Sequence, residues 1–221
     1  MLRLLIIAGV FACAGMAQAQ TAPTATDIAS YSGLHLAAHE GRSADIAQLI
    51  ADGADPDVRD GSARTPAHVA AFASHDDVIE ALAAGGADMN ALDNRVYDVV
   101  TIAAVANDPE LVSLAMRLGN SPTLITSVYD GTALIAAAHL GHHEVVARLV
   151  AGGAPLDHVN NLGWTALMEA VVLGDGGSDH VKTVQILVDA GADQTIADRD
   201  GVSPLQHAKA RGYSEIVSVL D

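Results

Sequence analysis

Three histidines and a glutamate stand within six positions of the segment HLGHHEVV, residues 139–146. Imidazole nitrogens and carboxylate oxygens at that density are the ligands that zinc and iron use in proteins. On a helix, two such ligands must be three or four residues apart to share one face. Gly141 separates His139 from the two later histidines, and a glycine there is expected to end a helix. We therefore expect these histidines to serve the structure, and we predict no metal site.

Other sequence patterns that carry chemistry are missing. No HExxH, GxSxG or Walker-type phosphate loop occurs in the sequence. The glycine-rich GDGG at 174–177 does not follow an expected strand, so a phosphate-binding loop is not expected there. Cys13 is the only cysteine, which leaves no second thiol for a disulfide or a thiolate metal site. We predict a protein that is not an enzyme and uses no cofactor.

Residues 1–19 have the pattern of a secretory signal peptide. An apolar run follows Arg3 and ends before the small residues Ala17-Gln18-Ala19, where cleavage is expected. The run is too short for a stable membrane anchor. The alternative, lipidation at Cys13, fits less well because the residues before it are not all small. We expect a periplasmic protein with no membrane anchor after cleavage, and a flexible leader over residues 20–30.

Charge and composition restrict the partner and the core. The 221 residues include 27 acidic and 11 basic ones, a net charge of −16. Such a surface repels phosphate backbones, so we expect no nucleic-acid partner and favour a protein with a basic patch. Half of the residues are hydrophobic, yet only 3% are aromatic. A core with so few rings must be thin, which favours closely packed helices of small residues.

The sequence repeats itself about every 33 residues. TPAHVAA at 65–71 follows the pattern of SGLHLAA at 32–38, and four later segments match in the same register. The first residue of each copy is the anchor, from which positions are counted. The anchors are Ser32, Thr65, Asp98, Thr132, Thr165 and Ser203. Position +9 holds a glycine in most copies, which predicts the end of a first helix there.

A period of 33 headed by T-P-x-H-x-A-A resembles the ankyrin repeat over residues 31–221. The resemblance implies an all-α solenoid of about six helix-turn-helix repeats, each with a finger loop before its anchor. Residues 130–212 are similar to a secreted bacterial subgroup of that family. The repeats are expected to start near residues 31, 60, 93, 128, 161 and 199. The family also implies that His35 and His68, at position +3, bond the neighbouring finger.

Three repeats depart from this pattern. Repeat 3 reads DVVT from its anchor, so its first turn must be fixed in another way. The finger of repeat 4 is one residue longer than its neighbours. Repeat 5 carries about five extra residues, DGGSD at 175–179, between its two expected helices.

The resemblance also indicates where a partner would bind. The residue before each anchor and positions +4, +7 and +8 line the concave face of such a solenoid. Most of the aromatic residues fall on this face, and aromatic side chains dominate binding hot spots. The alternative is that the rings only pack one finger on the next. The predicted partner-binding residues are Tyr31, Phe72, Tyr97, Val105, Tyr129, His139, Leu140, Leu162, Trp164, Glu169, Leu173 and Arg211.

Glu169 interrupts the otherwise apolar +4 line, with His139 one repeat away. A carboxylate among apolar neighbours must shift its pKa or hold a basic group. One hypothesis is that Glu169, Trp164, Tyr129 and His139 grip a Lys, an Arg or an amine of a partner. The alternative is that Glu169 caps local backbone groups.

Two classes of function remain open from the sequence. The leading one is an exported, monomeric, non-enzymatic module that binds an envelope protein on its concave face, as inhibitor, protector or scaffold. The other is a small-ligand or metal-binding protein, with weak hydrolytic activity at most, whose polar site lies in repeats 4 and 5. That site would consist of Asp130, His139, Asp157, His158, Asn160, Glu169 and the insertion 175–179. A third, minor hypothesis is a scaffold that only spaces other proteins.

Overall fold

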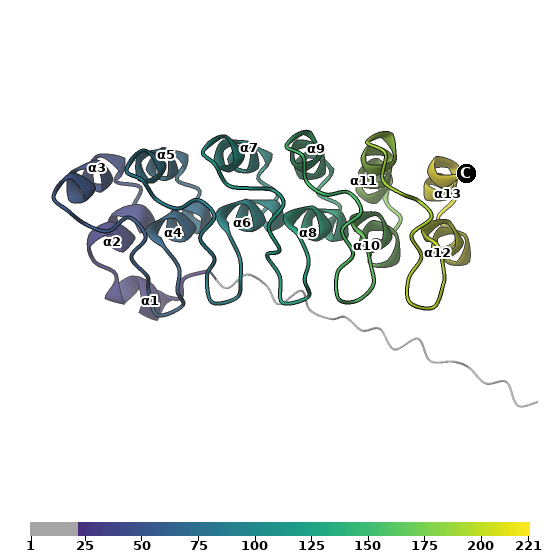
Figure 1. Cartoon of the computed structure of the whole chain (residues 1–221), viewed down its shortest axis with the longest axis horizontal. Helices are drawn as coiled ribbons and strands as arrows, with labels where there is room; N and C mark the ends of the chain where they lie inside the picture. Colours follow the sequence, from purple (N-terminus) through teal and green to yellow (C-terminus); the bar gives the residue numbers. More distant parts are fainter. Residues whose placement is uncertain (1–21) are drawn as a thin grey trace, which may run out of the picture.

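The computed structural model describes residues 22–221, which form thirteen helices and no strand. After the short helix α1 (Ala25–Ser30), the helices alternate between an inner and an outer layer (Figure 1). The inner helices are α2 (Gly33–His39), α4 (Pro66–Ala73), α6 (Val99–Val105), α8 (Ala133–Leu140), α10 (Ala166–Val172) and α12 (Pro204–Arg211). The outer helices are α3 (Ser43–Ala51), α5 (Asp76–Ala84), α7 (Pro109–Arg117), α9 (His143–Ala151), α11 (Ser178–Asp189) and α13 (Ser214–Leu220).

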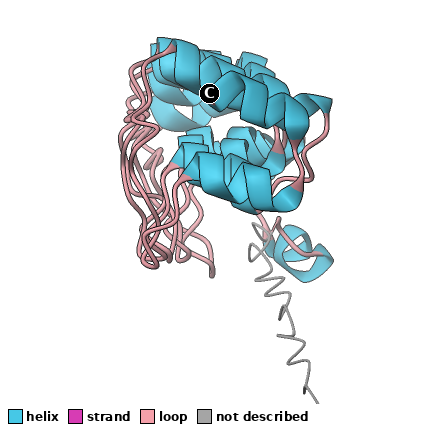
Figure 2. Ribbon diagram, turned by 90° about the vertical axis from the view of Figure 1, so that its right-hand side faces the viewer, coloured by secondary structure: helices cyan, strands magenta, loops and turns pink. Residues whose placement is uncertain are grey.

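Each inner helix and the outer helix after it form one repeat, and the repeats stack side by side. Seen along the stack, the fingers all project from the same side of the helices, roughly at right angles to them (Figure 2). The fingers and the exposed side of the inner helices enclose the concave surface. The predicted all-α solenoid of about six repeats is confirmed.

Alanine pairs at positions +5 and +6 explain how adjacent inner helices pack closely. Ala37 and Ala38 in α2, and Ala137 and Ala138 in α8, have no exposed surface. Alanine at these positions lets the helices approach closely, since interiors are close-packed, although repeat 5 buries the larger Val171 at position +6. The larger side chains of the core come from both layers, as with the fully buried Leu134 in α8 and Leu149 in α9.

Polar residues at the head of each repeat fix the start of the inner helix. The Oγ1 of Thr165 accepts a hydrogen bond from the amide of Met168 at 3.2 Å, a standard N-terminal cap. The predicted role of the head histidines is confirmed. The Nε2 of His35 donates to the Arg64 carbonyl oxygen at 2.9 Å. The Nε2 of His68 donates to the Tyr97 carbonyl oxygen at 3.0 Å, and burial lowers the pKa of His68.

Repeat 3 replaces the missing head motif with an Asp–Asn pair. The Oδ1 of Asp98 accepts from the Thr101 amide at 2.8 Å, and its Oδ2 accepts from the Asn120 Nδ2 at 2.7 Å. The Oδ1 of Asn120 in turn accepts from the Val100 amide at 3.0 Å. The first turn of α6 is therefore held from the end of the same repeat.

In every repeat but the fifth, position +9 ends the inner helix in a left-handed turn. Gly141 ends α8 with a φ of 71°, as predicted from its place in the histidine-rich segment. Ser74 and Asn107 take the same conformation, with φ of 56° and 57°, although they carry a Cβ. Backbone of that kind is strained for residues other than glycine. In repeat 5, part of the predicted insertion becomes the first turn of α11, which is the longest helix described.

The N-terminal segment differs from its prediction. Residues 20–30 were expected to be a flexible leader, but residues 25–30 form α1. Thr24 and Asp27 cap this helix reciprocally, and Asp27 also pairs with Arg64 at 3.0 Å. The predicted signal peptide, 1–19, lies outside the described residues, as do residues 20 and 21. In the part of the chain that the structure covers, no helix is long and apolar enough to cross a bilayer.

Candidate partner-binding surface

Exposed apolar side chains gather in repeats 4 and 5. Of the eight large hydrophobic side chains that are exposed among the described residues, seven lie between positions 125 and 173. The eighth is Val58, in the finger of repeat 2. A cluster of exposed apolar groups on one part of a soluble protein marks an interaction site. The seven are Ile125, Val128, Tyr129, Leu140, Val159, Leu162 and Leu173.

Five of these residues belong to the fingers of repeats 4 and 5 and are called the finger cluster. They are Ile125, Val128, Tyr129, Val159 and Leu162. The two fingers are bonded to each other: the Asn161 amide donates to the Tyr129 carbonyl oxygen at 2.9 Å, and the His158 Nε2 donates to the Asp130 carbonyl oxygen at 2.6 Å. These bonds hold the finger cluster in one arrangement, which lowers the entropy lost on binding a partner.

The other two exposed residues lie where inner helices end. Leu140 is the last residue of α8 and Leu173 follows the last residue of α10, and they are 38% and 36% exposed. The inner helices end on the side away from the fingers (Figure 2). The exposed apolar groups of these repeats therefore lie in the fingers and at the opposite ends of the inner helices.

Glu169 lies between these two edges, buried with only 4% of its surface exposed. Its Oε1 accepts a hydrogen bond from the Asn160 Nδ2 at 2.9 Å. Its Oε2 lies 3.2 Å from the His139 Nδ1, yet no donor in the described chain reaches Oε2 with hydrogen-bond geometry. The carboxylate thus connects the base of the finger of repeat 5 with the end of α8. Both partners are side chains, so the predicted alternative of a backbone cap is not what the structure contains.

Asn160 occupies position −5, which forms the base of each finger. Its Oδ1 accepts from the amides of Leu162 and Trp164, both at 3.0 Å. Asp198 takes the same place in repeat 6 and accepts from the Val202 amide at 2.9 Å. Its Oδ2 accepts from the Nε2 of His207, at position +4, at 2.7 Å. The pair Asn160–Glu169 is therefore one of two polar links between positions −5 and +4.

The predicted binding residues near the N-terminus have partners within the chain. The Tyr31 hydroxyl donates to the Asp60 Oδ2 at 2.9 Å, and the Tyr31 ring stacks on His35 with centroids 5.3 Å apart. Burial and the bond to Asp60 raise the pKa of Tyr31. Phe72 and Tyr97 are half-buried and pack against the core. These three rings stabilise repeats 1 to 3, and their role in binding stays a prediction.

Of the remaining predicted residues, two are half-buried and one is exposed. Trp164 and Val105 are half-buried, the first at the base of a finger and the second at the end of α6. Arg211 is exposed at the end of α12, one repeat beyond the finger cluster. Hydrogen bonds of Asn160 and Asn161 connect the backbones of Tyr129, Leu162 and Trp164 with Glu169, whereas Tyr31 and Arg211 lie at the two ends of the solenoid.

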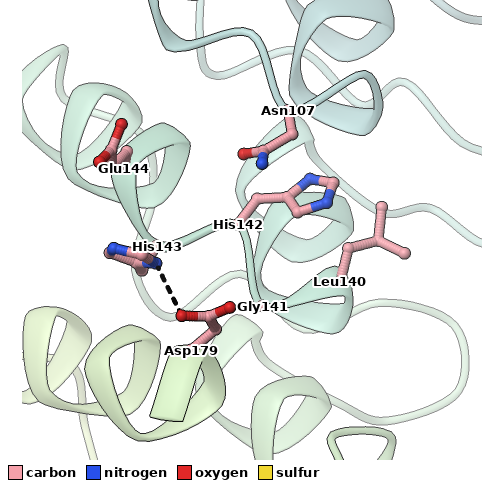
Figure 3. Close-up of a pocket in the computed structure, with 7 residues that line it drawn as sticks. All are labelled: Asn107, Leu140, Gly141, His142, His143, Glu144 and Asp179. Carbon is pink, nitrogen blue, oxygen red and sulfur yellow. Dashed lines mark ion pairs between the residues drawn. The ribbon is translucent and has the colours of Figure 1, made fainter.

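The histidine-rich segment lines a pocket of about 420 Å³ at the turns between inner and outer helices (Figure 3). His142 has the structural role expected of it, because its Nδ1 donates to the Ala104 carbonyl oxygen at 2.9 Å. The His143 Nδ1 lies 3.7 Å from the Asp179 carboxylate. Within residues 22–221, no three histidine, cysteine or acidic side chains come together as metal ligands would.

Other residues of the predicted small-ligand or metal site form hydrogen bonds within the chain. The Asp157 Oδ1 accepts from the Asp193 amide at 2.8 Å, which links two successive repeats. The Asp175 Oδ1 accepts from the Gly177 amide at 2.8 Å within the insertion. Such contacts are those of turn and loop residues.

The sequence prediction missed three members of the finger cluster: Ile125, Val128 and Val159. Val128 is the most exposed of them, at 57%. It stands four residues before its anchor, where repeats 2, 3 and 5 have Gly61, Asn94 and Asn161. An apolar residue at a position that is otherwise polar or glycine was the available signal.

Comparison with known proteins agrees with this architecture. A family model for ankyrin repeats matches residues 4–98 and 100–198. The crystal structure of an ankyrin repeat domain from Acinetobacter baumannii is 39% identical, and the match covers 85% of this chain and 95% of that one with a TM-score of 0.78. The ankyrin repeat protein EF0377 is 30% identical, with 86% and 98% covered and a TM-score of 0.79.

The ankyrin repeat domain of Bcl-3, a member of the IkappaB protein family, is 27% identical, with 86% and 85% covered and a TM-score of 0.76. A search of curated proteins found no match. Ankyrin repeats generally act as protein–protein interaction modules and not as enzymes. Because the family model matches most of the chain, this protein belongs to the ankyrin repeat family.

Proposed function

We propose that this protein is an exported, non-enzymatic module that binds an envelope protein through the concave surface of repeats 4 and 5. The observation that carries the proposal is the concentration of exposed apolar side chains there, seven of the eight among the described residues. Scattered single apolar residues need no explanation on a protein surface, but a cluster on a rigid support does.

The partner is expected to carry basic groups near its apolar contact. The net charge of the chain is −16, and Asp130 and Asp157 are exposed beside the finger cluster. Opposite charge on a partner would speed association and exclude other acidic proteins. Export rests on the signal-peptide pattern of residues 1–19.

Site-specific photo-crosslinking tests this function. A photoreactive residue at position 162 should capture one envelope protein in living cells, because Leu162 belongs to the finger cluster. The matched control is position 58, since Val58 is also a finger residue and is also 40% exposed. Equal capture at both positions, or capture only at position 58, would refute the proposed surface. Fractionation of the same cells tests export. A chain that keeps residues 1–19 and stays in the cytoplasm would refute the proposed export.

A further inference from the structure

Val96, in the finger of repeat 3, has a left-handed backbone conformation with a φ of 63°. It stands at position −2, and this position is left-handed in every finger from repeat 2 to repeat 6. The other residues at position −2 are Ala63, Asp130, Gly163 and Gly201. Among the described residues with a positive φ, Val96 is the only one with a branched Cβ. A branched Cβ in this conformation is crowded against its own backbone, so Val96 is strained where a glycine is not.

The finger holds Val96 in that conformation from both sides. The Oδ1 of Asp93 accepts from the amides of Arg95 and Tyr97, at 2.8 and 2.9 Å. The amide of Val96 itself donates to the Asp93 carbonyl oxygen at 3.0 Å. Repeat 5 forms the same turn with Gly163 at position −2. The turn therefore requires a left-handed residue and gives no reason for a valine.

Packing against the core does not explain the valine either. Val96 is half-buried. In the part of the chain that the structure describes, it is not among the half-buried apolar residues that pack against the core, whereas the adjacent Tyr97 is. Strained residues persist where the surrounding structure over-determines them, and they concentrate where a protein contacts a ligand. The strain at Val96 therefore points to a contact outside the chain.

The finger of repeat 3 is next to the finger of repeat 4 along the stack (Figure 1). That neighbouring finger contributes Val128 and Tyr129 to the finger cluster, and they are 57% and 38% exposed. Burial and the charge of Asp93 raise the pKa of Tyr97, and Tyr129 is close enough to raise it further. Because Tyr97 follows Val96 directly, the apolar surface of repeats 4 and 5 can continue onto repeat 3 at Val96.

We propose that Val96 is a further contact residue for the protein partner, and that its side chain extends the finger cluster onto repeat 3. The segment of the partner that lies there is apolar and has basic residues beside it, because Asp130 is exposed in the next finger and the chain has a net charge of −16. The valine then lowers the stability of the free protein and increases its affinity for the partner. This inference rests on the proposed function, because it adds a residue to the same surface.

Replacing Val96 by glycine separates these two effects. Glycine relieves the strain, as it does in repeats 5 and 6, so the melting temperature of Val96→Gly should rise by about 2 °C. The probe for binding is a peptide selected from a phage-displayed random library with the purified wild-type chain. The affinity of this peptide for Val96→Gly should be about fivefold lower than for the wild type, as expected for the loss of one apolar contact.

Two further variants serve as controls. Ala63→Gly makes a matched change at position −2 of repeat 2, and it should leave the affinity for the peptide unchanged within about twofold. Val96→Asn tests the flexibility that glycine adds, since asparagine tolerates a left-handed backbone, and it should weaken binding as much as Val96→Gly does. The inference is wrong if Val96→Gly binds the peptide as the wild type does, or if its melting temperature falls.

The variant Leu162→Ser separates this inference from the proposed function. Peptides whose binding is weakened by Leu162→Ser and not by Val96→Gly would overturn the inference and leave the proposed surface standing. Peptides whose binding is weakened by neither substitution, or a selection that enriches no peptide, would overturn both. Peptides weakened by Val96→Gly alone would separate Val96 from the finger cluster and would overturn the proposal that it extends that cluster.

Discussion

The residue at position −5 makes the same backbone hydrogen bonds in the fingers of repeats 2 and 5, but its other polar atom binds different side chains in the two repeats. The Oδ1 of Asp60 accepts from the amides of Ser62 and Arg64. Three repeats further on, the Oδ1 of Asn160 accepts from the amides of Leu162 and Trp164. The second polar atom of Asp60 binds Arg64 and Tyr31, whereas that of Asn160 binds Glu169. The turn of the finger depends only on the Oδ1 atom, so the partner of the second polar atom can differ between repeats.

The difference decides how much of each surface is already in use. In repeat 2, α1 supplies Asp27 to Arg64, which is only 1% exposed, so the chain covers its own concave surface there. In repeat 5 the corresponding position leads to the Glu169–His139 pair, with the finger cluster exposed beside it. The arrangement in repeat 2 therefore serves stability, whereas repeat 5 leaves exposed the surface that we propose binds a partner.

The largest effect is expected from removing the cation of repeat 2. Arg64→Ala leaves the Asp60 carboxylate buried without its charge partner, which should lower the free energy of unfolding by about 3 kcal/mol. Chemical denaturation of the two proteins measures this. The exposed Arg211→Ala is the matched control and should change stability by less than about 0.5 kcal/mol. Equal stability of Arg64→Ala and the wild type would contradict the closed arrangement.

In repeat 5, a substitution in the finger cluster should weaken binding of the partner and leave the stability of the fold nearly unchanged. Leu162→Ser removes an exposed apolar side chain from the finger cluster, and it should weaken capture of the crosslinked partner by about 2 kcal/mol, as at a hot spot. Val58→Ser, at equal exposure, should bind as the wild type does. A titration of each variant with the isolated partner gives both numbers, and identical affinities would remove repeat 5 from the interface.

The outer layer of repeat 5 contains a group that lowers stability. The Thr183 Oγ1 in α11 is fully buried and has no hydrogen-bond partner in the described chain. Thr183→Val keeps the shape and removes the unpaired hydroxyl, so the free energy of unfolding should rise by about 1 kcal/mol. Thermal unfolding measures it, and a loss of stability would mean that the hydroxyl has a partner after all.

Acid should loosen the N-terminal repeats before the C-terminal ones, and this is the smallest of the expected differences. Burial lowers the pKa of His68 from its ordinary value of 6.5, so the unfolded chain binds more protons than the folded one below that pH. The stability that His68 contributes is complete above about pH 6.5 and is lost as the pH falls toward its folded pKa. Repeats 4 to 6 have Ile135, Met168 and Gln206 at the same position.

Hydrogen exchange at falling pH, corrected for the intrinsic rate, follows each repeat separately. The amides of α4 should lose protection while those of α10 keep theirs. In His68→Gln the difference between the two helices should no longer depend on pH. Earlier loss in α10 would contradict the assignment.

The sequence predicted the solenoid well because its signals are local. Anchors such as Thr132 cap a helix, Gly141 ends it, and their spacing is visible as a period. The bonds of His35 and His68 to the next finger follow from the same pattern. These features depend on residues a few positions apart or one repeat away.

The parts that the sequence did not predict depend on distant contacts. A helix as short as α1 is unstable alone, and its contact with Arg64 joins residues 37 positions apart. The burial of Glu169 and its approach to His139 depend on how two repeats pack. The exposure of Val128 likewise depends on the arrangement of its finger, which is bonded to the finger of repeat 5 through Asn161.

The comparison between the two regions is tested most directly by hydrogen exchange on the complex with the crosslinked partner. New protection of backbone amides is expected in the fingers of repeats 4 and 5 and at the ends of α8 and α10, with residues 25–75 unchanged. Protection confined to α1 and repeats 1 and 2, or to the outer helices, would contradict this expectation.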